Sequence, residues 1–280
     1  MPRHLIDISN MSHDDIDRLF GMADEGPQPK GLAGLTYLSA FFQESTRTRL
    51  GFMGAAARQG AHVLDLGSAD RLRLEPQDDQ QMVLAGVADI TAVRHWDATL
   101  ARKLASRGRC CVVNAGAGGA SHPTQALIDA YTLTKAFRRD ITGLQVLFLG
   151  PLLRSAVSFR ELAAMLGVDV SHCGVATDAP RGERLRCRAA LQAADVIYVQ
   201  SLSDTEYDGP DLNAGSCGPA LPEWAVEAIV RSKAFIMHAL PRGPELPDSL
   251  MWDKHSLVAQ RVEHGLPVRS AVLRWLVQPS

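Results

Sequence analysis

The sequence has no long apolar run and almost no net charge. No stretch of its 280 residues is apolar for long enough to cross a membrane, and Met1–His4 leads into no signal-peptide segment. The formal charge of −2 gives no electrostatic reason for binding nucleic acid or an anionic membrane surface. We therefore expect a cytoplasmic protein that has neither a nucleic-acid nor a membrane partner.

Cysteine is scarce, and the common metal-binding and dinucleotide-binding patterns are missing. The five cysteines are odd in number and contain no C-x-x-C pair, which favours reduced thiols. The nine histidines show no metal-ligand spacing, so no metal centre is expected. Gly150–Leu153 follows a predicted strand but lacks the G-x-G-x-x-G fingerprint, which argues against a dinucleotide-dependent oxidoreductase.

The apolar pattern predicts an α/β protein. Apolar residues make up 46% and charged residues 21% of a chain long enough for two domains. Ser12 and Asp15 form a predicted capping box at the start of a helix. Short buried segments then alternate with helical patterns, as in βαβ units with parallel sheets. Strands are predicted at 35–41, 62–66, 90–93 and 110–114 in a first series, and at 143–150, 195–199 and 234–237 in a second.

The most distinctive segment is Phe42–Leu50, FQESTRTRL, between a predicted strand and a predicted helix. Free N–H groups and the positive end of the helix dipole favour an anion there. Ser45, Thr46 and Thr48 add hydroxyl donors, and Arg47 offers a bidentate guanidinium. The alternative is an ordinary helix cap with the arginines in solvent. Three hydroxyls and two arginines in five residues favour a phosphate site instead.

This segment resembles the carbamoyl-phosphate signature of the aspartate and ornithine carbamoyltransferases. Further segments resemble motifs of the same family in the same order along the chain. They are Ala92–His95 (AVRH), Asn114–Gly116 (NAG), His122–Leu127 (HPTQAL) and His238–Arg242 (HALPR). The resemblance spans nearly the whole chain and is strongest to the aspartate carbamoyltransferase catalytic chain.

The resemblance implies two Rossmann-like domains, each a mainly parallel sheet flanked by helices, joined by interdomain helices. A carbamoyl-phosphate-binding domain is expected at 1–133, completed by a C-terminal helix at 266–280, with an acceptor-binding domain at 134–265. The resemblance also implies a homotrimer whose active sites lie at subunit interfaces. The loop that would reach the neighbouring site carries Arg71 and Arg73, and Arg73 falls where the aspartate enzymes have a catalytic lysine.

By the same resemblance, carbamoyl phosphate is the donor. Thr48, Arg94 and His122 would donate to the developing oxyanion, and such a donor is typically worth about 3 kcal/mol. The leaving phosphate can take the amine proton, so no cofactor is required. The phosphate would be bound by Ser45, Thr46, Arg47, Thr48 and Arg94, and the carbamoyl amide by Gln125 and the carbonyls around Leu240 and Pro241.

The resemblance is weaker at the acceptor site. Ser201 and Ser203 stand where the aspartate enzymes have an arginine and a glutamine that bind the substrate's carboxylate. Arg154 corresponds to the arginine that binds the α-carboxylate, if two residues are deleted from the preceding loop. An amine or amino acid other than plain aspartate is therefore the expected acceptor, since a charge-assisted bidentate contact would be lost.

One alternative is a catalytically silent homologue that serves as a scaffold or regulatory subunit. A silent protein has no physical need for so many clustered donors, which argues against it. Binding of carbamoyl phosphate would distinguish the carbamoyltransferase and the silent homologue from an oxidoreductase, which would bind a dinucleotide instead.

Overall fold

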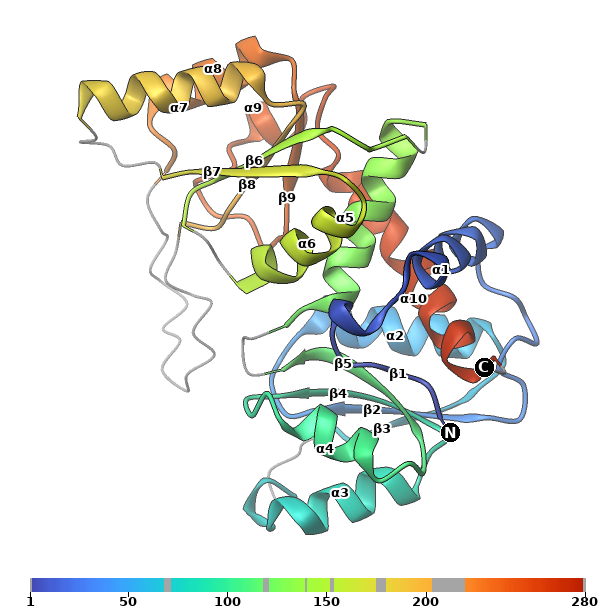
Figure 1. Cartoon of the computed structure of the whole chain (residues 1–280). Coiled ribbons are helices and arrows are strands. Elements are labelled where there is room, and N and C mark those ends of the chain that lie inside the picture. Colours follow the sequence, from blue (N-terminus) through green and yellow to red (C-terminus); the bar gives the residue numbers. More distant parts are fainter. Residues whose placement is uncertain are drawn as a thin grey trace. The chain divides into compact units, whose positions relative to one another are not determined.

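The computed structural model describes residues 2–67, 72–117, 121–138, 140–151, 154–174, 180–202 and 220–278, except the side chains of 73, 117, 154 and 155. The chain divides into two compact units. The first contains residues 1–131, 157–162 and 262–280, and the second contains 132–156 and 163–261. Figure 1 shows a sheet in each unit.

The first unit contains a five-stranded parallel sheet of order β1-β5-β4-β2-β3. Its strands are β1 (His4–Leu5), β2 (Thr36–Phe41), β3 (His62–Asp65), β4 (Ile90–His95) and β5 (Cys111–Ala117). Its helices are α1 (His13–Glu25), α2 (Thr46–Arg58), α3 (Gln77–Gly86), α4 (Leu100–Ser106) and most of α5 (Pro123–Ala136) and α10 (Val258–Val277), with short 3₁₀ helices η1 (Ile8–Asn10) and η2 (Leu72–Leu74).

Alternate residues of β2 serve the two faces of this sheet, because successive strand side chains point in opposite directions. Leu38 and Ala40 belong to an apolar cluster with residues of α3 and α4. Tyr37, on the other face, stacks on Phe52 of α2 with ring centroids 6.5 Å apart. Burial on both faces explains why β2 reads as a continuous apolar run.

The start of α1 follows the predicted local chemistry. The Ser12 hydroxyl accepts a hydrogen bond from the Asp15 N–H, and the Asp15 carboxylate accepts one from the Ser12 N–H. The helix ends at Gly26, whose φ of +69° is a conformation that L side chains rarely adopt. The predicted capping box is confirmed.

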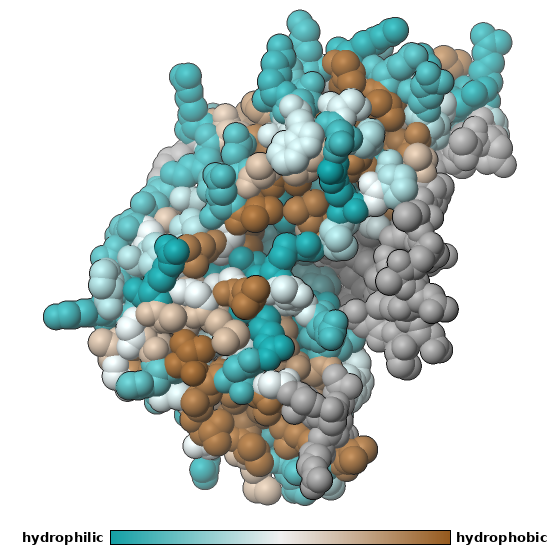
Figure 2. Space-filling view, turned by 180° about the vertical axis from the view of Figure 1, so that it is seen from behind, coloured by the Kyte–Doolittle hydropathy of each residue, from teal (hydrophilic) through white to brown (hydrophobic). Residues whose placement is uncertain are grey.

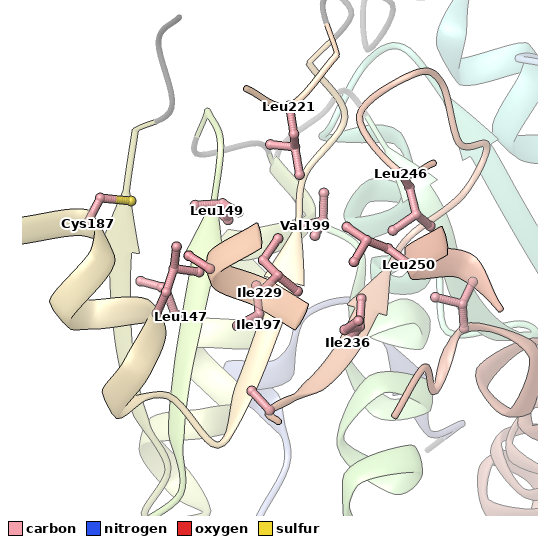
Figure 3. Packing of buried hydrophobic residues seen from close by; sticks show 14 residues of the cluster. Leu147, Leu149, Cys187, Ile197, Val199, Leu221, Ile229, Ile236, Leu246 and Leu250 are labelled. Atoms are coloured by element: carbon pink, nitrogen blue, oxygen red, sulfur yellow. The ribbon is translucent and has the colours of Figure 1, made fainter. Parts of the chain in front are cut away.

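The second unit contains a four-stranded parallel sheet of order β7-β6-β8-β9. Its strands are β6 (Gln145–Leu149), β7 (Asp169–Cys173), β8 (Val196–Val199) and β9 (Phe235–His238). Its helices are α7 (Arg181–Ala193), α8 (Glu223–Ser232), α9 (Asp248–Met251) and parts of α6 (Arg154–Met165). Figure 3 shows apolar side chains of β6, β8 and β9 packed together with Cys187 of α7, Ile229 of α8 and Leu250 of α9.

The expectation of reduced thiols is wrong for one pair. Cys173, at the end of β7, and Cys187, on α7, form a disulfide with their Cα atoms 5.8 Å apart. That separation is within the usual range for disulfides. Cysteine spacing could not reveal the pair, because the strand and the helix bring the two residues together only in the folded unit.

Each sheet has one reversal point, which is a pair of neighbouring strands whose outgoing connections run in opposite directions across the sheet. The reversal lies between β2 and β4 in the first sheet and between β6 and β8 in the second. Open parallel sheets bind their ligands outside the carboxyl ends of the strands at such a point. Each unit therefore has one edge position at which functional side chains are expected.

The predicted fold of two domains with parallel sheets flanked by helices is confirmed. The chain passes from one unit to the other within α5, α6 and α10. The assignment of carbamoyl phosphate to 1–133 and of the acceptor to 134–265 stays a prediction. Among the described residues, no helix is both long enough and apolar enough to span a membrane.

Candidate active site

The predicted phosphate segment lies at the reversal point of the first sheet. The Phe42 N–H donates to the Arg94 carbonyl over 2.8 Å, so the segment leaves β2 directly beside the end of β4. Ser45 is the N-cap residue of α2, yet its hydroxyl makes no capping hydrogen bond in the part of the chain that the structure describes. The first turn of α2 also contains no acidic side chain. Its N–H groups are therefore available to an anion.

The two arginines of this segment have different environments. The Arg49 guanidinium binds the carboxylate of Asp65 at the end of β3, with Nε to Oδ1 at 3.1 Å and a second contact from Nη2 to Oδ2. Arg47 is exposed in the first turn of α2, next to the half-buried Thr48. Arg49 thus has a structural partner, and Arg47 is solvent-exposed at the start of the helix.

Gly116 brings Arg94 and His122 together. Its φ is +112°, and a Cβ at this position would overlap Nη1 of Arg94 and stand 3.1 Å from Nδ1 of His122. Both nitrogens therefore lie within 3.1 Å of one point above the Gly116 backbone. Arg94 Nη1 also lies 3.5 Å from the Ala115 carbonyl oxygen. Only glycine leaves room for a cationic group and an imidazole at this separation.

Asn114 holds the turn that presents Gly116. It is buried, and its amide Nδ2 donates to the Ile6 carbonyl over 3.0 Å. Its Oδ1 accepts from the Gly116 N–H over 2.9 Å. Because both ends of the amide are used in this way, Asn114 supports the turn.

His122 is fixed at the start of α5 by its own backbone. Its N–H donates to the Ser158 hydroxyl over 2.9 Å, and its carbonyl accepts from the Gln125 N–H over 3.1 Å. Pro123 is the first residue of the helix, a position that favours proline. Sequence reasoning missed Ser158, which is buried and lies 36 positions along the chain from His122. The Gln125 Nε2 has no hydrogen-bond partner among the described residues.

In the second unit, the HALPR loop is held by a buried histidine–glutamate pair. The Leu240 N–H donates to Nδ1 of His238 over 2.8 Å, so the ring proton lies on Nε2, which is 3.0 Å from Oε1 of Glu245. Oε1 also accepts from the Gly243 N–H over 2.7 Å. Burial raises the pKa of Glu245, but these hydrogen bonds outweigh it and the pKa is lowered. The peptide bond between Leu240 and Pro241 is cis.

The remaining predicted residues are only partly described. Ser201 follows β8 and is half-buried. Ser203 and Arg71 lie outside the described residues, and so do the side chains of Arg73 and Arg154. No cluster of three or more possible metal ligands occurs in the described ranges. The first unit thus brings the α2 N-terminus, Arg94 and His122 to one sheet edge, and Leu240 and Pro241 belong to the second unit.

Comparison with known proteins gives matches along nearly the whole chain. Residues 3–135 match the model of the aspartate/ornithine carbamoyltransferase carbamoyl-P binding domain, and residues 142–276 match that of the Asp/Orn binding domain. The aspartate carbamoyltransferase catalytic subunit of Agrobacterium fabrum is 32% identical over 98% of this chain and 95% of its own.

Solved structures show the same similarity. The catalytic subunit of M. jannaschii aspartate transcarbamoylase aligns with a TM-score of 0.78 at 27% identity over 98% of each chain. Ornithine carbamoyltransferase from Thermus thermophilus aligns with a TM-score of 0.81 over 99% of this chain and 100% of its own. At 24% identity, that second likeness supports the fold alone.

Proposed function

The chain belongs to the aspartate/ornithine carbamoyltransferase family and is a carbamoyltransferase, and we propose that it transfers the carbamoyl group of carbamoyl phosphate to the amino group of aspartate. The observation that carries the donor half is the edge of the first sheet. There the first turn of α2, carrying the accessible Arg47, lies beside the end of β4 with Arg94 and His122.

The chemistry follows from the charges that the reaction creates. The amine nitrogen attacks the carbonyl carbon of carbamoyl phosphate, a C–N bond forms, and the C–O bond to phosphate breaks. The departing phosphate takes the proton that the amine must lose. Ser45, Thr46, Arg47 and Thr48 would bind the phosphate dianion through hydroxyl, guanidinium and N–H donors.

The carbonyl oxygen becomes negative during the attack and needs donors directed at it. Arg94 and His122 meet above Gly116 and would supply two of them, with Thr48 as a third. Gln125 has a buried amide Nε2 without a partner in the described residues, which suits it to contact the carbamoyl group. Contacts from the Leu240 and Pro241 carbonyls to the carbamoyl amide stay a prediction.

The acceptor assignment departs from the expectation drawn from Ser201 and Ser203. The similar catalytic subunit from Agrobacterium fabrum is named for aspartate, which favours aspartate here over a different amine. Comparing two positions tests only whether the same arginine and glutamine are present. Other donors along the carboxyl edge of the second sheet would then bind the carboxylate. Arg154 is proposed for the α-carboxylate.

The direct test is turnover of carbamoyl phosphate with single amino acids, scoring the ureido product and phosphate together. Aspartate should be carbamoylated faster than asparagine, glutamate or ornithine, with one phosphate released per product. Faster turnover of another acceptor would refute the acceptor assignment and leave the transferase assignment intact. Absence of turnover with every amine would instead favour the silent-scaffold alternative.

The phosphate site has a matched control on the same helix. Arg47→Ala should lower turnover at least about a hundredfold and weaken carbamoyl-phosphate binding. Arg58→Ala removes the same charge from the exposed last turn of α2 and should change neither quantity. Equal behaviour of the two variants would refute the phosphate assignment.

A homotrimer with shared active sites is part of the proposal. Figure 2 shows apolar side chains gathered on the lower part of the molecule, which belongs to the first unit. Exposed apolar side chains of this unit include Leu64, Leu74, Met82, Val83 and Val87. Apolar surface of this kind favours contact with another protein chain.

Mixing inactive Arg47→Ala with inactive Arg73→Ala should restore activity if the Arg73 loop completes a neighbour's site. No recovery in demonstrably mixed oligomers would refute sharing.

A further inference from the structure

Gln200 carries a buried side-chain amide at the carboxyl edge of the second sheet. It follows directly after β8, and its side chain is 2% exposed. Neither Nε2 nor Oε1 has a hydrogen-bond partner in the described part of the chain. Gln59 of the first unit is equally buried, yet its Nε2 donates to the carbonyls of Ala55 and Ser270. Buried side-chain amides are normally paired, so an amide with two free ends indicates a missing partner.

The position of Gln200 is the reversal point of the second sheet. Its N–H donates to the Leu149 carbonyl over 2.8 Å, which extends the pairing of β6 and β8 by one step. Figure 3 labels Leu149 and Val199, the last residues of these two strands. Gln200 therefore lies at the carboxyl edge of the sheet, beside the reversal point, where open parallel sheets bind their ligands.

The backbone beside Gln200 is shaped to let its side chain approach. Gly150 directly follows β6 and has a φ of +115°, and a Cβ there would stand 3.2 Å from Cβ of Gln200 and 3.0 Å from Cδ2 of Leu202. In the first unit Gly116 likewise has a positive φ and lies against the side chains of Arg94 and His122. In each unit a glycine with positive φ lies against a polar side chain at the carboxyl edge of the sheet.

We propose that Gln200 is a specificity-determining residue that binds the acceptor amino acid. A neutral amide offers N–H donors and a carbonyl acceptor, which complement the carboxylate and the amino group of an amino acid. It is poorly suited to a phosphate dianion, for which the first unit supplies guanidinium groups. Nε2–H donates to a carboxylate oxygen of the acceptor, in the role for which sequence comparison had considered Ser201 and Ser203. The inference rests on the proposed function.

Two variants at this position separate recognition from stability. Gln200→Leu approximately keeps the volume of the side chain and removes both polar groups. Gln200→Glu keeps the shape of the side chain but replaces the N–H donor by a negatively charged oxygen, which would repel the carboxylate of the acceptor. We expect the acceptor KM to rise about 10-fold or more in Gln200→Leu and further in Gln200→Glu. The KM for carbamoyl phosphate should stay unchanged in both variants.

Thermal unfolding without substrates supplies the second readout. Removing an unpaired buried amide should leave the Tm of Gln200→Leu equal to or above that of the wild type. Gln59→Leu, which loses real hydrogen bonds, should lower the Tm and leave the acceptor KM unchanged.

The outcomes also separate this inference from the proposed function. Wild-type protein that carbamoylates no amino acid would refute the proposed function itself. Wild-type turnover with an unchanged acceptor KM in both Gln200 variants would refute the inference alone. A Gln200→Leu variant with a lowered Tm and an unchanged acceptor KM would also refute it, and would assign the amide to a structural water.

Discussion

Replacing Gly116 by alanine should abolish most activity while leaving the protein folded. The new Cβ would overlap Nη1 of Arg94 and crowd His122 at 3.1 Å. Nη1 is the far end of a flexible side chain, so it can move away at little cost in stability. It is also the atom proposed to donate to the oxyanion. Losing one such donor typically lowers kcat by about 100–1,000-fold.

The backbone cost of this substitution can be measured separately. An L side chain in a sparsely populated φ region costs about 1–3 kcal/mol. Gly34 has a φ of +82° and no atom within 4 Å of its added Cβ, so Gly34→Ala carries the backbone strain alone. For a chain of this size, 1 kcal/mol corresponds to about 2–4 °C in Tm.

The assay compares Tm and carbamoyl transfer in the two variants. Both should lose similar Tm, and only Gly116→Ala should lose turnover by about 100-fold or more. Near-wild-type turnover in Gly116→Ala would refute the reasoning, because it would mean that Arg94 and His122 need not meet above this residue. Equal loss of turnover in both variants would assign the effect to strain instead.

Substitutions at three further positions test the scaffold. Cys187→Ser opens a disulfide that spans 14 positions, so it should cost about 3 kcal/mol in unfolding free energy, and thiol titration of the wild type should gain two groups on reduction. Glu245→Ala leaves the buried Nε2–H of His238 without its acceptor and should cost about 1–3 kcal/mol, whereas Glu245→Gln keeps an acceptor oxygen and should lose less Tm. Desolvation raises the pKa of Asp97, but hydrogen bonds and a nearby lysine outweigh this and lower the pKa to about 2. The ionised carboxylate therefore stabilises the folded protein above about pH 4, and this stabilisation is lost as the pH falls towards 2. Asp97→Asn should therefore lower the Tm at pH 6, and this effect should become smaller as the pH falls to 2. The loss of unfolding free energy at pH 6 should be at most about 2 kcal/mol, because solvent screens a side chain that is 24% exposed.

Local sequence signals predicted the elements around the donor site. The hydroxyls and arginines of 45–49 are contiguous, and the flanking strand and helix have strong apolar patterns, so their position needed no long-range information. Pro123 likewise marks the start of α5 in the sequence alone.

Other features depend on contacts that no local pattern carries. β7 lies at the edge of its sheet and has the sequence DVSHC with mostly exposed side chains, so it lacks the apolar run of a buried strand. Ser158 reaches the His122 N–H from a different helix, and Cys187 meets Cys173 across a strand and a helix. Gln200 reads as the polar end of an apolar strand, and its lack of partners is visible only once its neighbours are known.

The two sheet edges show how glycine and function are linked in this fold. At the carboxyl edge of each sheet a polar side chain lies near the end of one strand and a glycine with positive φ lies on or just after the neighbouring strand. The pairs are Arg94 of β4 with Gly116 of β5 (φ +112°), and Gln200 after β8 with Gly150 after β6 (φ +115°). An added Cβ at Gly116 would overlap the guanidinium of Arg94, and one at Gly150 would stand 3.0 Å from Cδ2 of Leu202 and 3.2 Å from Cβ of Gln200. Gly34 also has a positive φ, but no atom lies within 4 Å of its added Cβ. Gly116 and Gly150 therefore leave room at the two sheet edges for Arg94 and Gln200. The cationic edge of the first sheet suits a phosphate donor, and the neutral edge of the second suits an amino-acid acceptor.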